Sequence, residues 1–174
     1  ALQIEQGYEF SSDTDTEVIA HAIDFSLQTS DSLLEAVQKT LRTFEGSYGL
    51  GIISSNYPNT LIAARKGSPL LIGIGDNGNY IASDQMALLS ATKRFIFLEE
   101  GDIAELSLEN ITIYNKTGDV VKRPIKVSNL KDGEVGLGTY DHYMQKEIFE
   151  QPQAIRDTLE SSISKDKVVI SAFG

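Results

Sequence analysis

The chain has 174 residues, of which 41% are apolar and four are proline, so its length and composition fit one globular domain and argue against disorder. Its 25 acidic and 15 basic residues give a formal charge of −10, and no Lys/Arg run is present that could neutralise a phosphate backbone, which argues against a nucleic-acid partner. The sequence contains no cysteine, which excludes disulfides, cysteine zinc sites and cysteine nucleophiles within this chain.

Two helices are predicted near the beginning of the chain. Thr14 as N-cap and Glu17 three residues later match a capping box, in which the two side chains satisfy backbone N–H groups at the start of a helix. Ser32 and Glu35 repeat the pattern before a second run of apolar residues at helical spacing. We expect Gly46 to end this second helix, because glycine tolerates the left-handed conformation that often closes a helix.

From residue 47 onward the apolar period changes to two, and turn-forming residues recur every eight to twelve positions, as in a sheet of antiparallel neighbours. The predicted strands are 47–54, 60–65, 70–75, 80–83, 94–98, 103–108 and 111–115, with a short helix over 85–91. Two helices followed by many short strands predict an α+β architecture, with helices on one side of a largely antiparallel sheet.

The last part of the chain has a different pattern. Residues 124–139 have little periodic apolar content, which predicts a linker or an extended surface segment. Apolar residues then recur at helical spacing from 143 to 159, and Pro152 is expected in the first turn of a new helix. Residues 167–170 are predicted to form a strand or to begin a further domain.

No feature of the sequence indicates a membrane. No apolar stretch approaches the roughly 20 residues that a spanning helix needs. The first residues lack the basic-then-apolar pattern of a signal peptide. We therefore expect a soluble, cytoplasmic protein without a membrane partner.

The residues do not form a self-contained catalytic set. His21 and His142 lie in unrelated segments without metal-ligand spacing, so a structural role is expected for His21 and a surface or interdomain contact for His142. The glycines at 49, 51 and 73–75 do not precede a capped helix at the spacing of a phosphate-binding loop, so they are expected to serve close packing or strand twist.

Two segments could face a charged group. The basic turn 65–69 could bind an anion, although a solvated hairpin corner is the simpler interpretation. Asp15 lies where a carboxylate usually serves a helix start. If Thr14 and Glu17 already provide the cap, Asp15 is free to point elsewhere, and an amino group of a ligand would suit it.

Five stretches, in this order and at similar spacings, resemble the glucosamine-6-phosphate synthase family, and together they cover essentially the whole chain. They are residues 12–21 (SDTDTEVIAH), 65–70 (RKGSPL), 81–85 (IASDQ), 94–105 (RFIFLEEGDIAE) and 143–152 (YMQKEIFEQP). The last of these stretches is the most specific. The resemblance implies an N-terminal-nucleophile amidohydrolase fold, a four-layer α/β/β/α sandwich with largely antiparallel sheets, here truncated at its N-terminal side.

The resemblance also implies a function. In that family, this domain hydrolyses glutamine and passes ammonia to a sugar-isomerase domain, where fructose 6-phosphate becomes glucosamine 6-phosphate. Residues 1–123 are then expected to be the C-terminal portion of the glutaminase domain. Residues 124–174 would be the linker and the beginning of the isomerase domain, with 143–152 positioning the two domains. We expect no metal, no organic cofactor and a homo-oligomeric parent enzyme.

The catalytic residues of the family have no counterpart in this sequence. They are a cysteine at the mature N-terminus, an Asn-Gly pair that forms the oxyanion hole and an arginine that holds the substrate carboxylate. We expect all of them to lie upstream of Ala1, so the chain alone should be inactive. The resemblance assigns one residue to substrate: Asp15 would bind the α-ammonium of glutamine, a charge-assisted contact of roughly 1.5–3 kcal/mol.

Two alternatives stay open. The chain could be a non-catalytic ligand-binding or regulatory module on the same scaffold, which a natural start codon near Ala1 would favour. It could also come from another amidotransferase of the same superfamily. The stretch 143–152 weighs against the second alternative, because it resembles the sugar enzyme in particular.

Overall fold

The computed structural model describes residues 6–14, 16–129, 139–164 and 167–168, and the side chains of the last helix as far as residue 155. The chain divides into two compact units, Ala1–Asn129 and Leu130–Gly174. Each unit is described by itself.

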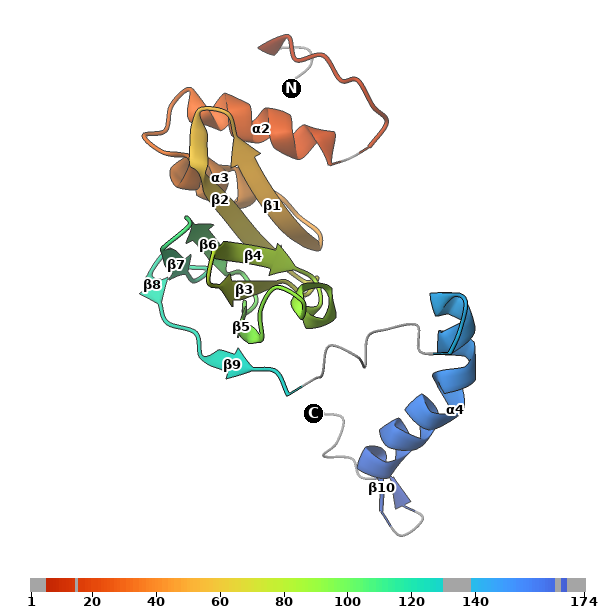
Figure 1. The fold of residues 1–174 in the computed structure, drawn as a ribbon. Helices are drawn as coiled ribbons and strands as arrows, with labels where there is room; N and C mark the ends of the chain where they lie inside the picture. Colours follow the sequence, from red (N-terminus) through yellow and green to blue (C-terminus); the bar gives the residue numbers. More distant parts are fainter. Residues whose placement is uncertain (1–5, 15, 130–138, 165–166, 169–174) are drawn as a thin grey trace. The chain divides into compact units, whose positions relative to one another are not determined.

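The first unit begins with two helices, α2 (Glu17–Leu27) and α3 (Leu33–Leu41), which pack against each other (Figure 1). The capping box is confirmed in part for α3, because the Ser32 hydroxyl accepts a hydrogen bond from the backbone N–H of Glu35 at 3.1 Å. It is wrong for α2, whose N-cap is Thr16. The expected end of α3 is also wrong, because the helix stops at Leu41 and Gly46, with a φ of 102°, turns the loop that follows.

Two antiparallel sheets follow the helices. The larger has the order β1-β2-β6-β7-β8 and the smaller β4-β3-β5-β9, and every pairing is antiparallel, as predicted. The strands are β1 (Tyr48–Ser54), β2 (Tyr57–Lys66), β3 (Leu71–Gly75), β4 (Gly78–Ala82), β5 (Arg94–Phe97), β6 (Ile103–Leu106), β7 (Ile111–Tyr114), β8 (Val120–Val121) and β9 (Ile125–Val127). The segment from residue 124 thus begins as an exposed, extended strand.

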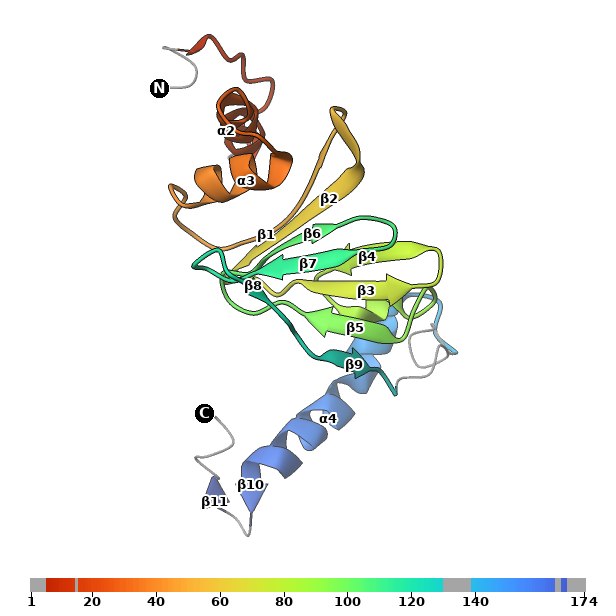
Figure 2. The same ribbon diagram turned by 90° about the vertical axis from the view of Figure 1, so that its left-hand side faces the viewer.

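The two sheets are stacked, and the helices cover the free face of the larger one (Figure 2). Strand β2 shows how the sequence builds this arrangement, because successive side chains of a strand point to opposite faces. Ile62 and Ala64 pack under the helices, whereas Ala63 packs between the sheets. All three side chains are fully buried. Two hydrophobic layers therefore hold the unit together, one on each face of the larger sheet.

A short 3-10 helix, η1 (Gln85–Leu88), contacts strands β3 and β4 of the smaller sheet. The contact depends on Gly73, because a β-carbon there would lie 3.0 Å from a methyl of Leu88 and 2.9 Å from the methyl of Thr92. The expectation that this glycine serves close packing is confirmed. The helical element predicted over 85–91 is present but shorter.

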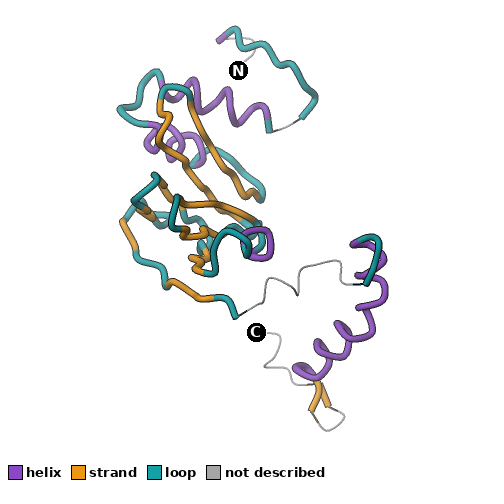
Figure 3. Tube along the Cα trace, viewed as in Figure 1, coloured by secondary structure: helices purple, strands orange, loops and turns teal. Residues whose placement is uncertain are grey.

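The second unit contains the helix α4 (Tyr143–Ser162) and a short antiparallel hairpin, β10 (Ile163–Ser164) with β11 (Lys167–Val168) (Figure 3). Pro152 lies inside α4, so its expected place in the first turn of a new helix is wrong. Nine helical residues precede this proline, although its ring lacks the N–H donor and crowds the carbonyl four residues earlier. None of the helices in the described part of the chain is long and apolar enough to span a bilayer.

Candidate functional site

The segment before helix α2 is organised around the carboxylate of Glu17. Its Oε1 accepts hydrogen bonds from the backbone N–H and the hydroxyl of Ser11, at 2.8 and 2.9 Å. Its Oε2 accepts the equivalent pair from Ser12, at 2.8 and 2.5 Å. One side chain of the first helical turn therefore holds two consecutive residues of the preceding segment. We call Ser11, Ser12, Thr14 and Glu17, with these four bonds, the Glu17 clamp.

Thr14 completes the described part of the Glu17 clamp. Its hydroxyl lies 2.7 Å from Ser12 Oγ, and its carbonyl accepts the backbone N–H of Glu17 at 3.3 Å. The hydrogen bonds lower the pKa of Glu17 to about 2, with the backbone N–H of Ser11 as the largest cause. The carboxylate therefore stays ionised over the whole neutral range.

His21 supports this region from helix α2. Its ring packs against those of Tyr8 and Phe10, with centroid distances of 5.0 and 4.6 Å, and its Nε2 lies 3.4 Å from Glu17 Oε1. Tyr8 donates its hydroxyl to Asp24 at 2.7 Å, and this bond is the first cause of the raised pKa of Tyr8. Aromatic packing thus fixes residues 8–10 beside the helix.

Asp15, the residue assigned to substrate, lies outside the described residues. Its neighbours in sequence are described on both sides: Thr14 within the Glu17 clamp and Thr16 as the N-cap of α2. The assignment of Asp15 to a ligand assumed that Glu17 and Thr14 cap the helix. The structure replaces this premise, because Glu17 binds residues upstream of the helix.

The basic turn 65–69 already binds a carboxylate of the same chain. The backbone N–H of Gly67 donates to both carboxylate oxygens of Glu100, at 3.0 and 2.9 Å. Arg65 donates to the carbonyl of Leu98, and Lys66 donates to the carbonyl of Phe44 at 2.8 Å. Arg65, Lys66 and Glu100 line a cavity of about 310 Å³ between α3, β2 and the turns around residues 100 and 116. The intramolecular contacts favour a structural role for the turn.

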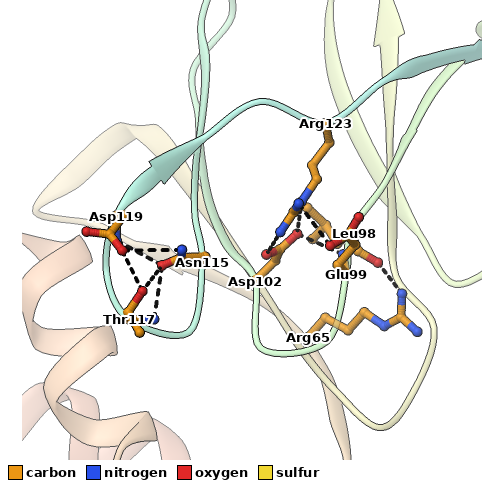
Figure 4. A network of polar contacts seen from close by, with 8 residues as sticks. All are labelled: Arg65, Leu98, Glu99, Asp102, Asn115, Thr117, Asp119 and Arg123. Atoms are coloured by element: carbon orange, nitrogen blue, oxygen red, sulfur yellow. Dashed lines mark hydrogen bonds and ion pairs between the residues drawn. The ribbon is translucent and has the colours of Figure 1, made fainter.

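A buried ion pair, which sequence reasoning missed, joins two turns of the first unit (Figure 4). Asp102 is completely buried and accepts two hydrogen bonds from Arg123, from Nε at 2.9 Å and from Nη2 at 2.8 Å. Glu99 adds a second carboxylate 2.9 Å from Arg123 Nη1. The bond to Asp102 is the main cause of the raised pKa of Arg123. The two residues are 21 positions apart in the chain, so no local spacing could indicate the pair.

The other candidate residues lie in strands or directly before a helix. The glycines at 49 and 51 lie in β1, and those at 73 and 75 in β3, so none belongs to a phosphate-binding loop. His142 precedes α4, where its carbonyl accepts the backbone N–H of Lys146. Within the described residues, no group of three or more His, Asp or Glu side chains could hold a metal ion.

Comparison with known proteins identifies relatives over nearly the whole chain. The glutamine–fructose-6-phosphate aminotransferase (isomerizing) of Haemophilus influenzae is 49% identical over 169 residues, which are 97% of this chain and 28% of that protein. The protein of the same name from Escherichia coli K12 is 52% identical over the same shares. No family model matches the chain. The chain thus spans about 28% of the length of these relatives.

A solved structure supports the same classification. Glutamine phosphoribosylpyrophosphate amidotransferase from B. subtilis, complexed with ADP and GMP, superposes with a TM-score of 0.54 and 25% identity. The match covers 66% of this chain and 25% of that one. The predicted N-terminal-nucleophile amidotransferase fold is therefore confirmed. With the relatives above, the likeness shows that this chain is similar to one segment of the longer glutamine–fructose-6-phosphate aminotransferases.

Proposed function

We propose that this chain provides the scaffold and the substrate-ammonium side of a glutamine-hydrolysing domain. The observation that supports the proposal is the identity of 49–52% with glutamine–fructose-6-phosphate aminotransferases over 97% of the chain. In the complete protein, the ammonia released from glutamine would serve the conversion of fructose 6-phosphate to glucosamine 6-phosphate. Residues 1–123 would belong to the glutaminase part and 124–174 to the passage towards the sugar-isomerase part.

The chemistry divides between this chain and the rest of the polypeptide. A thiolate would attack the carboxamide carbon of glutamine, ammonia would leave with the proton of a general acid, and water would hydrolyse the thioester to glutamate. This sequence contains no cysteine, so another segment of the protein would supply the nucleophile. Within this chain we assign one contact, between the carboxylate of Asp15 and the α-ammonium of glutamine.

Asp15→Asn in the complete protein tests this assignment. The amide keeps the shape of the side chain and removes its charge, so kcat/KM for glutamine should fall by an amount corresponding to about 1–3 kcal/mol. The unfolding midpoint should change little. An unchanged kcat/KM together with a lower unfolding midpoint would show that Asp15 is only part of the helix start.

The chain by itself gives a second test. Purified protein of this sequence, incubated with glutamine, should release no glutamate above the uncatalysed background, because it contains no thiolate nucleophile. If turnover persisted after repurification, the division of roles proposed here would be wrong. If the chain is instead part of a non-catalytic module, it should bind glutamine, and the complete protein should not hydrolyse glutamine.

A further inference from the structure

The cavity beside the basic turn has a charge opposite to that of the whole chain. The chain contains 25 acidic and 15 basic residues, but four of the residues that line the cavity are basic and one is acidic. The basic residues are Arg42 at the end of α3, Arg65 and Lys66 at the end of β2, and Lys116 in the turn after β7. A cavity lined mainly by one sign of charge concentrates ligands of the opposite sign.

The four cations differ in how far this chain already uses them. The side chains of Arg65 and Lys66 each donate to a backbone carbonyl. The ammonium of Lys66 has three donors, so it keeps further capacity for a ligand. Arg42 and Lys116 are exposed, and neither side chain makes a hydrogen bond or ion pair with a described residue. Two cations are therefore fully available to an anion in the cavity, and a third is available in part.

The turn that contains Lys116 has a fixed conformation. Asn115 Oδ1 accepts hydrogen bonds from the backbone N–H of Thr117 at 3.0 Å and of Asp119 at 2.9 Å (Figure 4). The Lys116 stem lies close against Gly101, where a β-carbon would stand 2.8 Å from Lys116 Cβ. A φ of 81° also favours glycine at position 101. Because the turn is ordered before a ligand arrives, binding costs less conformational entropy.

The floor of the cavity is aromatic and apolar. Leu41, Tyr48 and Ile103 line it from the hydrophobic layer beneath the helices. Burial, and then the nearby Glu100 carboxylate, raise the pKa of Tyr48, so its hydroxyl remains protonated and can donate a hydrogen bond. The volume of about 310 Å³ lies at the lower end of the range for small-molecule pockets, roughly 300–1,000 Å³. One ring with one anionic group suits this space better than a dinucleotide.

We propose that the cavity binds a phosphate monoester of a small sugar, with the phosphate held by Arg42, Lys66 and Lys116 and the sugar ring packed on Tyr48. A dianion matches three cations better than a carboxylate does. The hydroxyls of the sugar match the amide of Gln38, which also lines the cavity. A polyanion such as nucleic acid is disfavoured by the formal charge of −10. The site goes beyond the proposed glutamine chemistry, and none of its lining residues belongs to the segment before α2.

Calorimetric titration of this chain tests the site, with fructose 6-phosphate, inorganic phosphate and fructose as probes. At about 50 mM salt, where surface charges are only partly screened, we expect a Kd below about 1 mM for fructose 6-phosphate. Inorganic phosphate should bind about threefold to tenfold more weakly, because it lacks the ring, and fructose should not bind. In NMR spectra, the amides of Gly101 and Gly118 should shift and saturate with fructose 6-phosphate, since both residues line the cavity.

Four variants separate a built site from general attraction between charges. Arg42→Gln and Lys116→Gln should each raise the Kd for fructose 6-phosphate about fivefold. Lys122→Gln is the matched control, because Lys122 is exposed and does not line the cavity, and it should change the Kd less than twofold. Glu100→Gln should lower the Kd about threefold, because it removes the one carboxylate of the lining while its amide oxygen can still accept from Gly67.

Three results would overturn the inference. The first is the absence of saturable shifts at Gly101 and Gly118 up to about 20 mM fructose 6-phosphate. The second is an equal loss of affinity in Lys116→Gln and Lys122→Gln, which would indicate general attraction between charges. The third is equal affinity for inorganic phosphate and fructose 6-phosphate, which would exclude the sugar. All three leave the proposed function untouched, because that function is measured by glutamine hydrolysis in the complete protein.

Discussion

Two acidic residues show how differently this chain stabilises a carboxylate. Glu17 is surrounded by four neutral donors from Ser11 and Ser12, whereas Asp102 is fully buried against the guanidinium of Arg123. The sequence indicated that Glu17 has a local role, since a capping box is a short-range pattern. It could not indicate which N–H groups the carboxylate would select. The partner of Asp102 depends on the tertiary fold, and sequence spacing contains no information about it.

The first prediction concerns the pH dependence of the Glu17 clamp. The pKa of Glu17 is lowered from 4.5 to about 2, so the clamp favours the ionised form. A group with a lowered pKa contributes its full stabilisation above its unfolded-state value and loses it as the pH falls through the folded-state value. The amide resonances of Ser11 and Ser12 should therefore stay constant down to about pH 4.5 and titrate towards a midpoint near 2.

NMR of this chain between pH 6 and pH 2 measures the effect, with Glu17→Gln as the control that has no carboxylate at this position. In that variant, the amide resonances of Ser11 and Ser12 should not show this titration, because the carboxylate is absent. A midpoint near the ordinary value for glutamate in the wild-type chain would show that the four hydrogen bonds are not formed in solution.

The second prediction concerns the buried ion pair. Asp102→Asn keeps the shape of the side chain and removes the charge that faces Arg123. Breaking one partner of a buried pair is strongly destabilising, but Arg123 is 17% exposed and keeps Glu99 as a partner. We therefore expect the free energy of unfolding to fall by about 2–3 kcal/mol.

Urea unfolding of the two proteins measures the difference, and Glu99→Gln is the matched control, because its side chain is 64% exposed. The control should lose no more than about 0.5 kcal/mol. Equal losses in both variants would mean that burial of Asp102 adds nothing to its interaction with Arg123.

At the scale of elements, the sequence predicted seven of the nine strands of the first unit and missed the short strands β8 and β9, and its other errors lie at the ends of helices. Period-two alternation can be read from the sequence wherever one face of a strand is more buried than the other, as in β6, where Ala104 and Leu106 are buried and Glu105 is only partly so. Helix ends depend on which donor and acceptor groups meet, and Gly46 was assigned to a helix that ends five residues earlier. The continuation of α4 through Pro152 is a similar case, since the local rule predicts a new start there.

The third prediction compares the two helix starts. Ser32 accepts a hydrogen bond from the N–H of Glu35, so Ser32→Ala should lower the free energy of unfolding by about 1 kcal/mol. Thr16 makes no side-chain capping bond among the described residues, so Thr16→Ala should cost less than about 0.5 kcal/mol. Chemical unfolding of both variants at one pH gives the comparison. A larger loss in Thr16→Ala would reveal a capping role for Thr16.

At the scale of the whole molecule, the fold class followed from the sequence, and the site followed only in part. Apolar periodicity and the family resemblance together predicted stacked antiparallel sheets beneath a helical layer, which the two core layers confirm. The assignment of Asp15 came from the resemblance and stays a prediction. The Glu17 clamp could not be predicted, because Ser11, Ser12 and Glu17 come together only in the folded chain.

The last prediction tests where the first unit ends. Both core layers consist of residues between 19 and 121, and strand β9 adds the pairs Phe95–Lys126 and Ile96–Ile125 to the edge of the smaller sheet. The Lys126 ammonium also lies 5.2 Å from the ring centroid of Phe97. A protein of residues 1–129 should therefore unfold within about 2 °C of the full chain, since it keeps these contacts. A protein of residues 1–123 loses β9 and its few ladder hydrogen bonds, a cost of about 1–3 kcal/mol that should lower the unfolding midpoint by about 3–10 °C. Calorimetry of the three proteins distinguishes the compact unit that ends at Asn129 from the proposed domain boundary after Arg123. Equal unfolding midpoints for the two shortened proteins would favour the boundary after Arg123.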